Sequence, residues 1–451
     1  MNLKSINKFL LLFFFSLLYT SFIYYLNFFL LEDYSKYYIC SELRTFGINI
    51  LDLRIDLILP YTCDSEYFLG FRDISEIIKN EFSYQFRPLY FLLVGIVSKV
   101  VSLFFIDDSL LIFIFGSLIF HLLIANLSFW LILKSFKEKF NTLTIAFMYF
   151  IFLLNPIFKW GIFDPSHQTL TVLNFCLIFY MLRNKNKIKN TNIYIFSLIF
   201  GILFLLNKIF VLSFIVYSVI KFFQIKNDFV IYFTKTFSLK IFIFYFPTIL
   251  YKRIIEFFGF VPYDSSTEFW QHFIWVKNFL FGNETADGTW YCQSIPDNFL
   301  CYLEDSVLTL NYLILPIGYL LIKLAILFYF KLVKDSSQIL LALIITFMIN
   351  FSFWSLIGWY PPLRFNLYSF FPAIFVLFLV TFKHSPTRLK YILCSNLAIY
   401  LLSLRHWNYP LVIDYNFIFY LNLIIFAIIL IFDFKYIKKE SSLILNNLFS
   451  T

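Results

Sequence analysis

Long apolar segments recur from near the beginning of this chain to near its end, beginning at Phe9 and continuing to Phe434. An α-helix needs about 20 predominantly apolar residues to cross the hydrocarbon core of a bilayer. A soluble domain of 451 residues, 61% hydrophobic and only 14% charged, could not cover its apolar surface. We therefore predict an all-α polytopic membrane protein, with residues 1–451 forming a single integral membrane domain.

About twelve segments are predicted to be transmembrane helices, although several are short for a full span. They lie at 9–31, 109–133, 142–158, 166–182, 193–206, 209–223, 229–251, 307–330, 337–357, 365–382, 389–404 and 415–434. The first is too long for the apolar region of a signal peptide, and no small-residue cleavage site follows it. We interpret it as an uncleaved span.

Lysine and arginine in the short loops predict the orientation, because cytoplasmic loops carry an excess of both. One set of alternate loops is rich in them: Lys4, Lys8, Lys134, Lys137, Lys139, Arg183, Lys185, Lys187, Lys189, Lys221, Lys226, Lys331, Lys334, Lys383, Arg388, Lys390, Lys435, Lys438 and Lys439. The other set holds only Lys159, Lys208, Arg364 and Arg405. Both termini are therefore predicted to be cytoplasmic, in a plasma or inner membrane.

Two longer polar stretches face outward in this topology. The first extracytoplasmic loop is assigned to 32–108, the transmembrane core to 109–251, the second loop to 252–306, and the C-terminal helices to 307–451. Both loops are expected to contain short interfacial helices.

The apolar segment 88–106 lies within the first loop. Arg87 follows an outer loop and the Lys134 cluster is cytoplasmic, so an odd number of crossings must separate them. Two apolar segments, 88–106 and 109–133, lie between, and only one of them can cross. We infer that 88–106 lies on or dips into the outer leaflet.

The net charge of +9 does not indicate a nucleic-acid partner, because the basic residues are dispersed between apolar segments. The bilayer itself is the expected partner.

The six cysteines divide by location. Cys176 and Cys394 fall in predicted spans and are interpreted as small core residues. Two pairs occupy the outer loops, and each suits a disulfide in an oxidising compartment: Cys40 with Cys63, and Cys292 with Cys301. Four unpaired thiols are the alternative. Zinc is disfavoured, because neither loop has closely spaced Cys or His ligands.

The triplet Asp64-Ser65-Glu66 in the first outer loop carries two carboxylates two residues apart. Carboxylates at this spacing can share a divalent cation such as Mg²⁺ or Mn²⁺, or one can act as a general base that the other orients. A solvated acidic turn is the alternative reading.

The order of segments resembles the glycosyltransferase-C superfamily. The matching pieces are a first span, an acidic outer loop and the Arg-Pro-Leu-Tyr that opens 88–106, followed by LLNPIFKWGIFDPSHQTLTVLNFCLIFYMLR, GILFLLNKIFVLSFIVYSVI and GWYPPLRFNLYSFFPAIFVLFL. The third piece is similar to the family's helical hairpin with a lysine at its tip. The resemblance covers about 9–382 and supports a superfamily, not a particular enzyme. The long stretch before Asp64 and the last spans depart from the pattern.

The resemblance implies an inverting transferase that takes a sugar from a polyprenyl-phosphate donor and passes it to an acceptor hydroxyl of a glycan, lipid or protein. Asp64 would be the general base, and Glu66 would position it or hold a cation; many members of the superfamily need no metal. Arg87 and Arg364 would grip the carrier phosphate, with Lys208 as a second-rank candidate.

Each of these side chains also has a structural reading. Arg87 and Lys208 are equally suited to anchor at lipid headgroups, and Arg364 to a structural ion pair. Asp164 and His167, in a short outer loop, are candidate acceptor contacts, although His167 also suits a polar helix cap.

Three classes of function are compatible with this sequence. The leading one is the glycosyltransferase. A polysaccharide polymerase or ligase of the O-antigen type is the first alternative, and there alanine at Asp64 should leave activity intact. A multispan transporter is the second; transporters usually show an inverted repeat or mid-membrane charges, whereas nearly all charges here fall at predicted interfaces.

Overall fold

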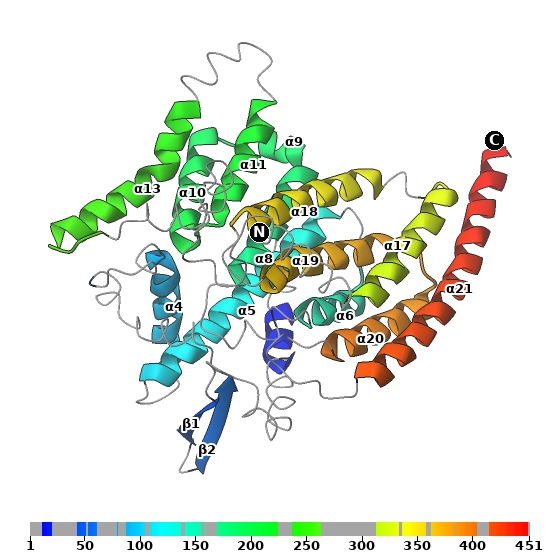
Figure 1. Cartoon of the computed structure of the whole chain (residues 1–451), viewed down its shortest axis with the longest axis horizontal. Coiled ribbons are helices and arrows are strands. Elements are labelled where there is room, and N and C mark those ends of the chain that lie inside the picture. Colours follow the sequence, from blue (N-terminus) through cyan, green and yellow to red (C-terminus); the bar gives the residue numbers. More distant parts are fainter. Residues whose placement is uncertain are drawn as a thin grey trace, which may run out of the picture. The chain divides into compact units, whose positions relative to one another are not determined.

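Helices make up most of the computed structural model (Figure 1), which describes residues 11–19, 43–50, 53–60, 79, 87–103, 109–136, 140–154, 158, 169–223, 237–262, 313–332, 336–357, 362–382, 384–403 and 415–449. The helices are α4 (Pro88–Val101), α5 (Ser109–Ser135), α6 (Thr142–Leu153), α8 (Thr169–Arg183), α9 (Lys185–Lys189), α10 (Ile193–Leu206), α11 (Phe210–Phe222), α13 (Ser238–Phe257), α17 (Ile314–Tyr329), α18 (Ser337–Ile357), α19 (Pro362–Phe382), α20 (Thr387–Ser403) and α21 (Tyr415–Phe449). Residues 11–19 are also helical.

One β-hairpin accompanies the helices of the described part of the chain, which otherwise agrees with the predicted all-α class. Strands β1 (Leu43–Ile50) and β2 (Leu53–Pro60) pair antiparallel, with Ile50 opposite Leu53. They lie in the first polar stretch, where short interfacial helices were expected. The sequence LRIDL within β2 alternates apolar and charged residues, which is the period of a strand and not of a helix. That signal was overlooked.

The described helices otherwise follow the predicted apolar segments closely. α10 and α18 have the predicted bounds. α21 continues past the predicted end at 434, because Lys and Glu support a helix as well as apolar residues do. Hydropathy therefore locates the end of the apolar segment and not the end of the helix.

Two helices in the described part of the chain are long and apolar enough to cross a bilayer, at Ile112–Ser135 and Phe419–Ser442. Other apolar helices are shorter, with 10 to 17 residues, and α4 is one of them. At about 1.5 Å per residue, fourteen residues reach only about 21 Å, less than the hydrocarbon thickness. Helix lengths alone therefore do not establish about twelve spans.

The chain divides into two compact units. Unit 1 consists of Met1–Tyr34, Ser135–Lys159 and Phe273–Thr451, and unit 2 of Ser35–Lys134 and Trp160–His272. α6 belongs to unit 1 with the C-terminal helices, whereas α5 and α8 belong to unit 2.

Aromatic side chains form much of the packing within unit 2. α13 approaches α10 so closely that a Cβ on Gly201 would meet the backbone carbonyl group of Phe244. The Phe244 ring stacks on Phe214 of α11, with centroids 4.2 Å apart. Cys176 of α8 is fully buried, as predicted for a core cysteine.

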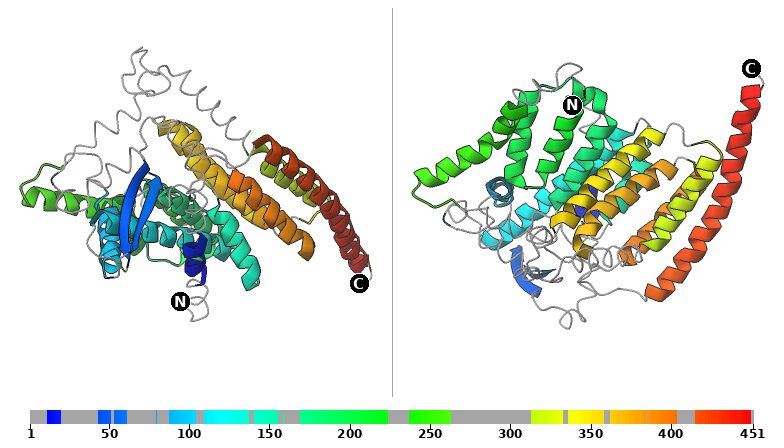
Figure 2. Two further views of the ribbon diagram at one scale, coloured as in Figure 1. Left: turned by 90° about the horizontal axis from the view of Figure 1, so that it is seen from below. Right: turned by 45° about the horizontal axis from the view of Figure 1, so that its top comes forward.

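Unit 1 joins the N-terminal helical residues to α6 and α6 to the C-terminal helices (Figure 2). The Tyr19 hydroxyl donates to the Leu153 carbonyl at 2.6 Å, and Ser16 and Tyr149 hydrogen-bond at 3.0 Å. α20 packs against both α6 and α21. Its Cys394 is buried, which agrees with the prediction for that residue.

Candidate functional site

Most of the predicted site residues lie outside the described residues, and their assignments remain predictions. These are Asp64, Glu66, Asp164, His167, Cys40, Cys63, Cys292 and Cys301. Among the residues that the structure describes, no group of three His, Cys, Asp or Glu side chains forms a candidate metal site.

Arg87 lies at the start of α4, in unit 2. Pro88 follows it at the first helical position, where its missing N–H leaves no hydrogen bond unmade. The Tyr90 N–H donates to the Arg87 carbonyl at 3.1 Å, which closes the first turn. The Arg87 side chain is half-buried. A guanidinium held at a helix N-terminus is well placed to bind an anion.

A buried polar network fixes this end of α4 against α5. The Tyr90 hydroxyl lies 3.1 Å from His121 Nε2 and 3.4 Å from Ser117 Oγ. The Tyr90 and His121 rings stack, with centroids 6.1 Å apart and planes at 25°. All three side chains are buried. Sequence reasoning missed this network, because a single Tyr or His in an apolar segment does not indicate its partner.

Further along α4, Gly116 of α5 lies directly against Ser98. A Cβ built on Gly116 would come within 2.9 Å of Ser98 Cα, a separation that real Cβ atoms essentially never show. Ser98 thus lies beside Gly116, and Tyr90 lies beside His121. The two helices therefore run in opposite directions, and the Arg87 end of α4 lies beside the middle of α5.

Lys208 lies in the short turn between α10 and α11. The Asn207 side chain accepts a hydrogen bond from the Ile209 N–H at 3.0 Å, which stabilises the turn. α10 and α11 pack against each other, so the predicted helical hairpin with a lysine at its tip is present. Arg364 falls in the first turn of α19, in unit 1. Its side chain lies outside the described residues.

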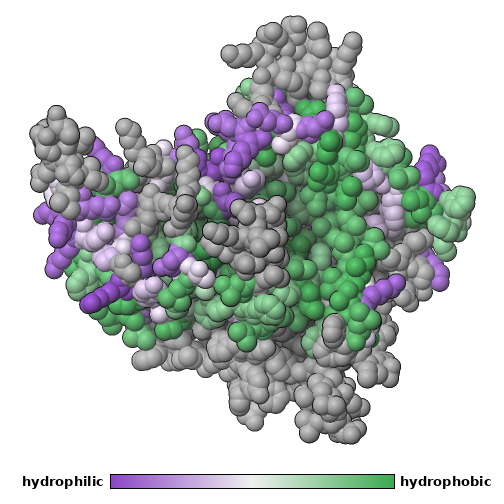
Figure 3. Space-filling view, turned by 180° about the vertical axis from the view of Figure 1, so that it is seen from behind, coloured by the Kyte–Doolittle hydropathy of each residue, from purple (hydrophilic) through white to green (hydrophobic). Residues whose placement is uncertain are grey.

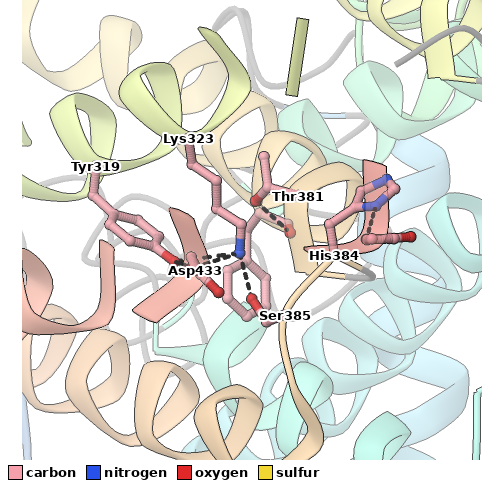
Figure 4. A network of polar contacts seen from close by, with 8 residues as sticks. Tyr319, Lys323, Thr381, His384, Ser385 and Asp433 are labelled. Atoms are coloured by element: carbon pink, nitrogen blue, oxygen red, sulfur yellow. Dashed lines mark hydrogen bonds and ion pairs between the residues drawn. The ribbon is translucent and has the colours of Figure 1, made fainter. Parts of the chain in front are cut away.

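A second buried polar cluster occupies unit 1 (Figure 4). Lys323 Nζ of α17 lies 2.8 Å from Asp433 Oδ2 of α21, and neither side chain is exposed. The Tyr319 hydroxyl donates to the same carboxylate oxygen at 2.6 Å. Lys323 also donates to Ser385 Oγ, in the turn between α19 and α20.

A more exposed contact between a histidine and a glutamate lies in the same part of unit 1. His384 Nδ1 is 3.4 Å from Glu440 Oε2, with side chains 10% and 33% exposed. Both pairs involve α21: Lys323–Asp433 joins it to α17 and is fully buried, whereas His384–Glu440 joins it to the α19–α20 turn and is partly exposed. They therefore form a natural internal comparison.

The Lys323–Asp433 pair is the functional feature that the sequence interpretation missed. Both residues fall within predicted spans, in LLIKLAILFY and AIILIFDFKY. An ionisable residue within a membrane segment requires a partner or a water-filled cavity, and this was the available signal. The sequence shows that each charge needs a partner, but it does not show which one.

No family model, curated protein or solved structure matches this chain. The case for its function therefore depends on its own residues.

Proposed function

We propose that the protein is a multispan membrane glycosyltransferase. It transfers a sugar from a polyprenyl-phosphate donor to an acceptor hydroxyl on the extracytoplasmic side, with inversion. Both termini are cytoplasmic in this proposal.

The directions of contacting helices support many spans. Lys323, Ser385 and Asp433 come together, and all three lie next to loops assigned to the cytoplasm by their lysines and arginines. In unit 2, Lys221 Nζ donates to the Thr191 carbonyl at 2.6 Å, and these residues also flank loops assigned to the cytoplasm. These contacts join segments that the charge pattern assigns to the same side of the membrane, which agrees with the proposed topology.

Apolar side chains on the outer surfaces of the helices support a location in the bilayer. Large hydrophobic residues face outward along several helices, among them Ile215, Phe242, Ile322, Leu341 and Phe432, each at least half exposed. Figure 3 shows apolar side chains over much of the visible surface. Soluble monomers rarely expose contiguous patches above a few hundred Å². Lipid would cover such a surface.

The placement of Arg87 is the observation that carries the enzymatic part of the proposal. α4 lies along the first half of α5, from Gly116 to His121, which is near the middle of that apolar helix. This arrangement fits a helix that dips into the membrane better than one that lies flat on its surface. Arg87 immediately precedes α4 and its side chain is half-buried, so it is the cation that the proposal assigns to the carrier phosphate. Guanidinium groups bind phosphate through charge-assisted, often bidentate hydrogen bonds.

The reaction proposed is a single displacement. The acceptor oxygen attacks the anomeric carbon as its proton passes to Asp64, and the bond to the carrier phosphate breaks with its electron pair on the phosphate oxygen. Arg87 and Arg364 stabilise that leaving group, with Lys208 as an additional candidate. Glu66 orients Asp64 or binds a divalent cation, and Asp164 and His167 contact the acceptor.

A transporter is the second candidate, because Lys323 and Asp433 place charges inside apolar helices. Their complete burial argues against a transport pathway, which requires access to water. For the polysaccharide polymerase or ligase, no contact within the described residues offers comparable support.

The proposal is tested with the full chain in proteoliposomes and a defined panel of polyprenyl-phosphate hexose and pentose donors. Asp64→Ala should lower the transfer rate by about 10²–10⁴-fold, the usual contribution of a general base. Arg87→Ala should raise the donor KM, and Arg87→Lys should restore part of the loss. Arg253→Gln is the matched control, since Arg253 is 75% exposed in a surface ion pair on α13. Unchanged transfer in Asp64→Ala would refute the proposal.

A further inference from the structure

α21 is joined to unit 1 along one narrow stripe of side chains. Only 28% of its apolar window is buried. The buried positions recur every three or four residues and so lie on one face of the helix: Asn422, Phe426, Ile429, Asp433 and Ile437. The rest of the helix is largely exposed, including Ile424, Ile428, Ile431 and Phe432. α21 packs against α17 and α20, and Asp433 is the charged residue on its buried face.

α17 supplies the facing side of this stripe. The Tyr319 ring stacks on Phe426, with centroids 5.1 Å apart, and the Phe330 ring lies 5.9 Å from that of Phe434. Since both numbers rise together, α17 and α21 run in the same direction. Figure 4 shows Lys323 and Asp433 directed toward each other between the two helices.

The hydrogen bonds of Lys323 are all used inside the protein. Its ammonium group has three N–H donors, and its recorded acceptors are Asp433, Ser385 and, at 3.4 Å, the Tyr319 hydroxyl. No donor remains for a bound ligand. With both side chains fully buried, the pair also lacks the solvent access that a proton relay needs. The pair therefore connects two helices and has no access to solvent or to a ligand.

We propose that the Lys323–Asp433 pair is an assembly lock, which holds α21 against α17 and the α19–α20 turn. Either charge alone is costly in lipid, whereas the pair is neutral and the Lys323 ammonium group has three acceptors; of the Asp433 carboxylate, Oδ2 is paired and Oδ1 has no hydrogen-bond partner among the described residues. α17 and α21 are thus stable in the bilayer together and unstable apart. This device is independent of the proposed transferase activity.

Cross-linking in native membranes tests the lock. A Phe330→Cys/Phe434→Cys pair reports contact between α17 and α21 in the full chain. Lys323→Met or Asp433→Leu should each lower the cross-linking yield about tenfold, because each leaves one buried charge unpaired. The double change Lys323→Met/Asp433→Leu should restore the yield to within about twofold, because an apolar pair needs no ionic partner.

Glu440→Gln provides the matched control, because Glu440 joins the same helix to the same turn from a partly exposed position. It should leave the yield unchanged. If the apolar double variant were as poor as either single variant, the charges would act in more than attachment and the lock would be wrong. Full cross-linking in both single variants would overturn it equally.

Discussion

The two buried polar clusters of this protein join helices in different ways. In unit 2, Tyr90, Ser117 and His121 connect α4 to α5 through hydrogen bonds, and no opposite charge is required. In unit 1, Lys323 and Asp433 connect α17 to α21 through full charges, neither of them exposed. The first cluster sets how a short helix is positioned, and the second decides whether a long helix is attached.

The two clusters differ in the free-energy cost of losing one partner. Separating Tyr90 from His121 exposes neutral groups, and hydrogen bonds between helices in membranes contribute about 0.6 kcal/mol on average. Removing one partner of a buried ion pair costs about 3–5 kcal/mol, because the other charge is left buried and unpaired. Charged connections are therefore much more sensitive to the loss of one partner.

The largest effect is expected at Asp433. Replacing it with Leu should lower the free energy of unfolding by about 3–5 kcal/mol, because Lys323 is left buried and unpaired. The measurement is denaturant unfolding in mixed micelles. Adding Lys323→Met should recover all but about 1 kcal/mol of this loss, since the apolar pair no longer carries a buried charge. A loss below about 1 kcal/mol for Asp433→Leu alone would remove the contrast between the two clusters.

An intermediate effect is expected at the closest approach of α4 to α5. Gly116→Leu should lower the free energy of unfolding by about 1–3 kcal/mol, because the new side chain meets the Ser98 backbone. Gly95→Ala is the control on α4, since nothing lies within 4 Å of its added Cβ. It should raise stability by about 0.5–1 kcal/mol through helix propensity. If Gly116→Leu and Gly95→Ala changed the free energy of unfolding equally, Gly116 would not determine how closely α4 and α5 pack.

The smallest effect is expected for Tyr90→Phe, which keeps the buried ring but removes the hydroxyl. The loss should be about 0.6–1 kcal/mol in the same unfolding assay. Tyr420→Phe should cause no loss, because Tyr420 is 63% exposed on α21. If Tyr90→Phe cost as much as Asp433→Leu, charge would not be what distinguishes the two clusters.

Much of the helical architecture could be predicted from hydropathy. α10 and α18 were located to the residue, since apolar segments bounded by polar ones leave little freedom for the ends. The β-hairpin was missed because a two-stranded element has only a short alternating signal. Of the candidate site, the lysine at the α10–α11 tip and the position of Arg87 before a short apolar helix were foreseen. The partners that fix α4 were not, because they depend on contacts between residues far apart in sequence.

The amino-acid sequence alone determined the helical class and predicted a membrane protein, because 61% of its residues are hydrophobic and they lie in long segments. It places Lys323 and Asp433 in apolar segments, although the sequence interpretation did not single them out. Only the tertiary structure decided that they are partners of each other, across about 110 residues of chain. Hydropathy is a local property that each segment carries by itself, whereas the pairing of charges depends on which helices pack together.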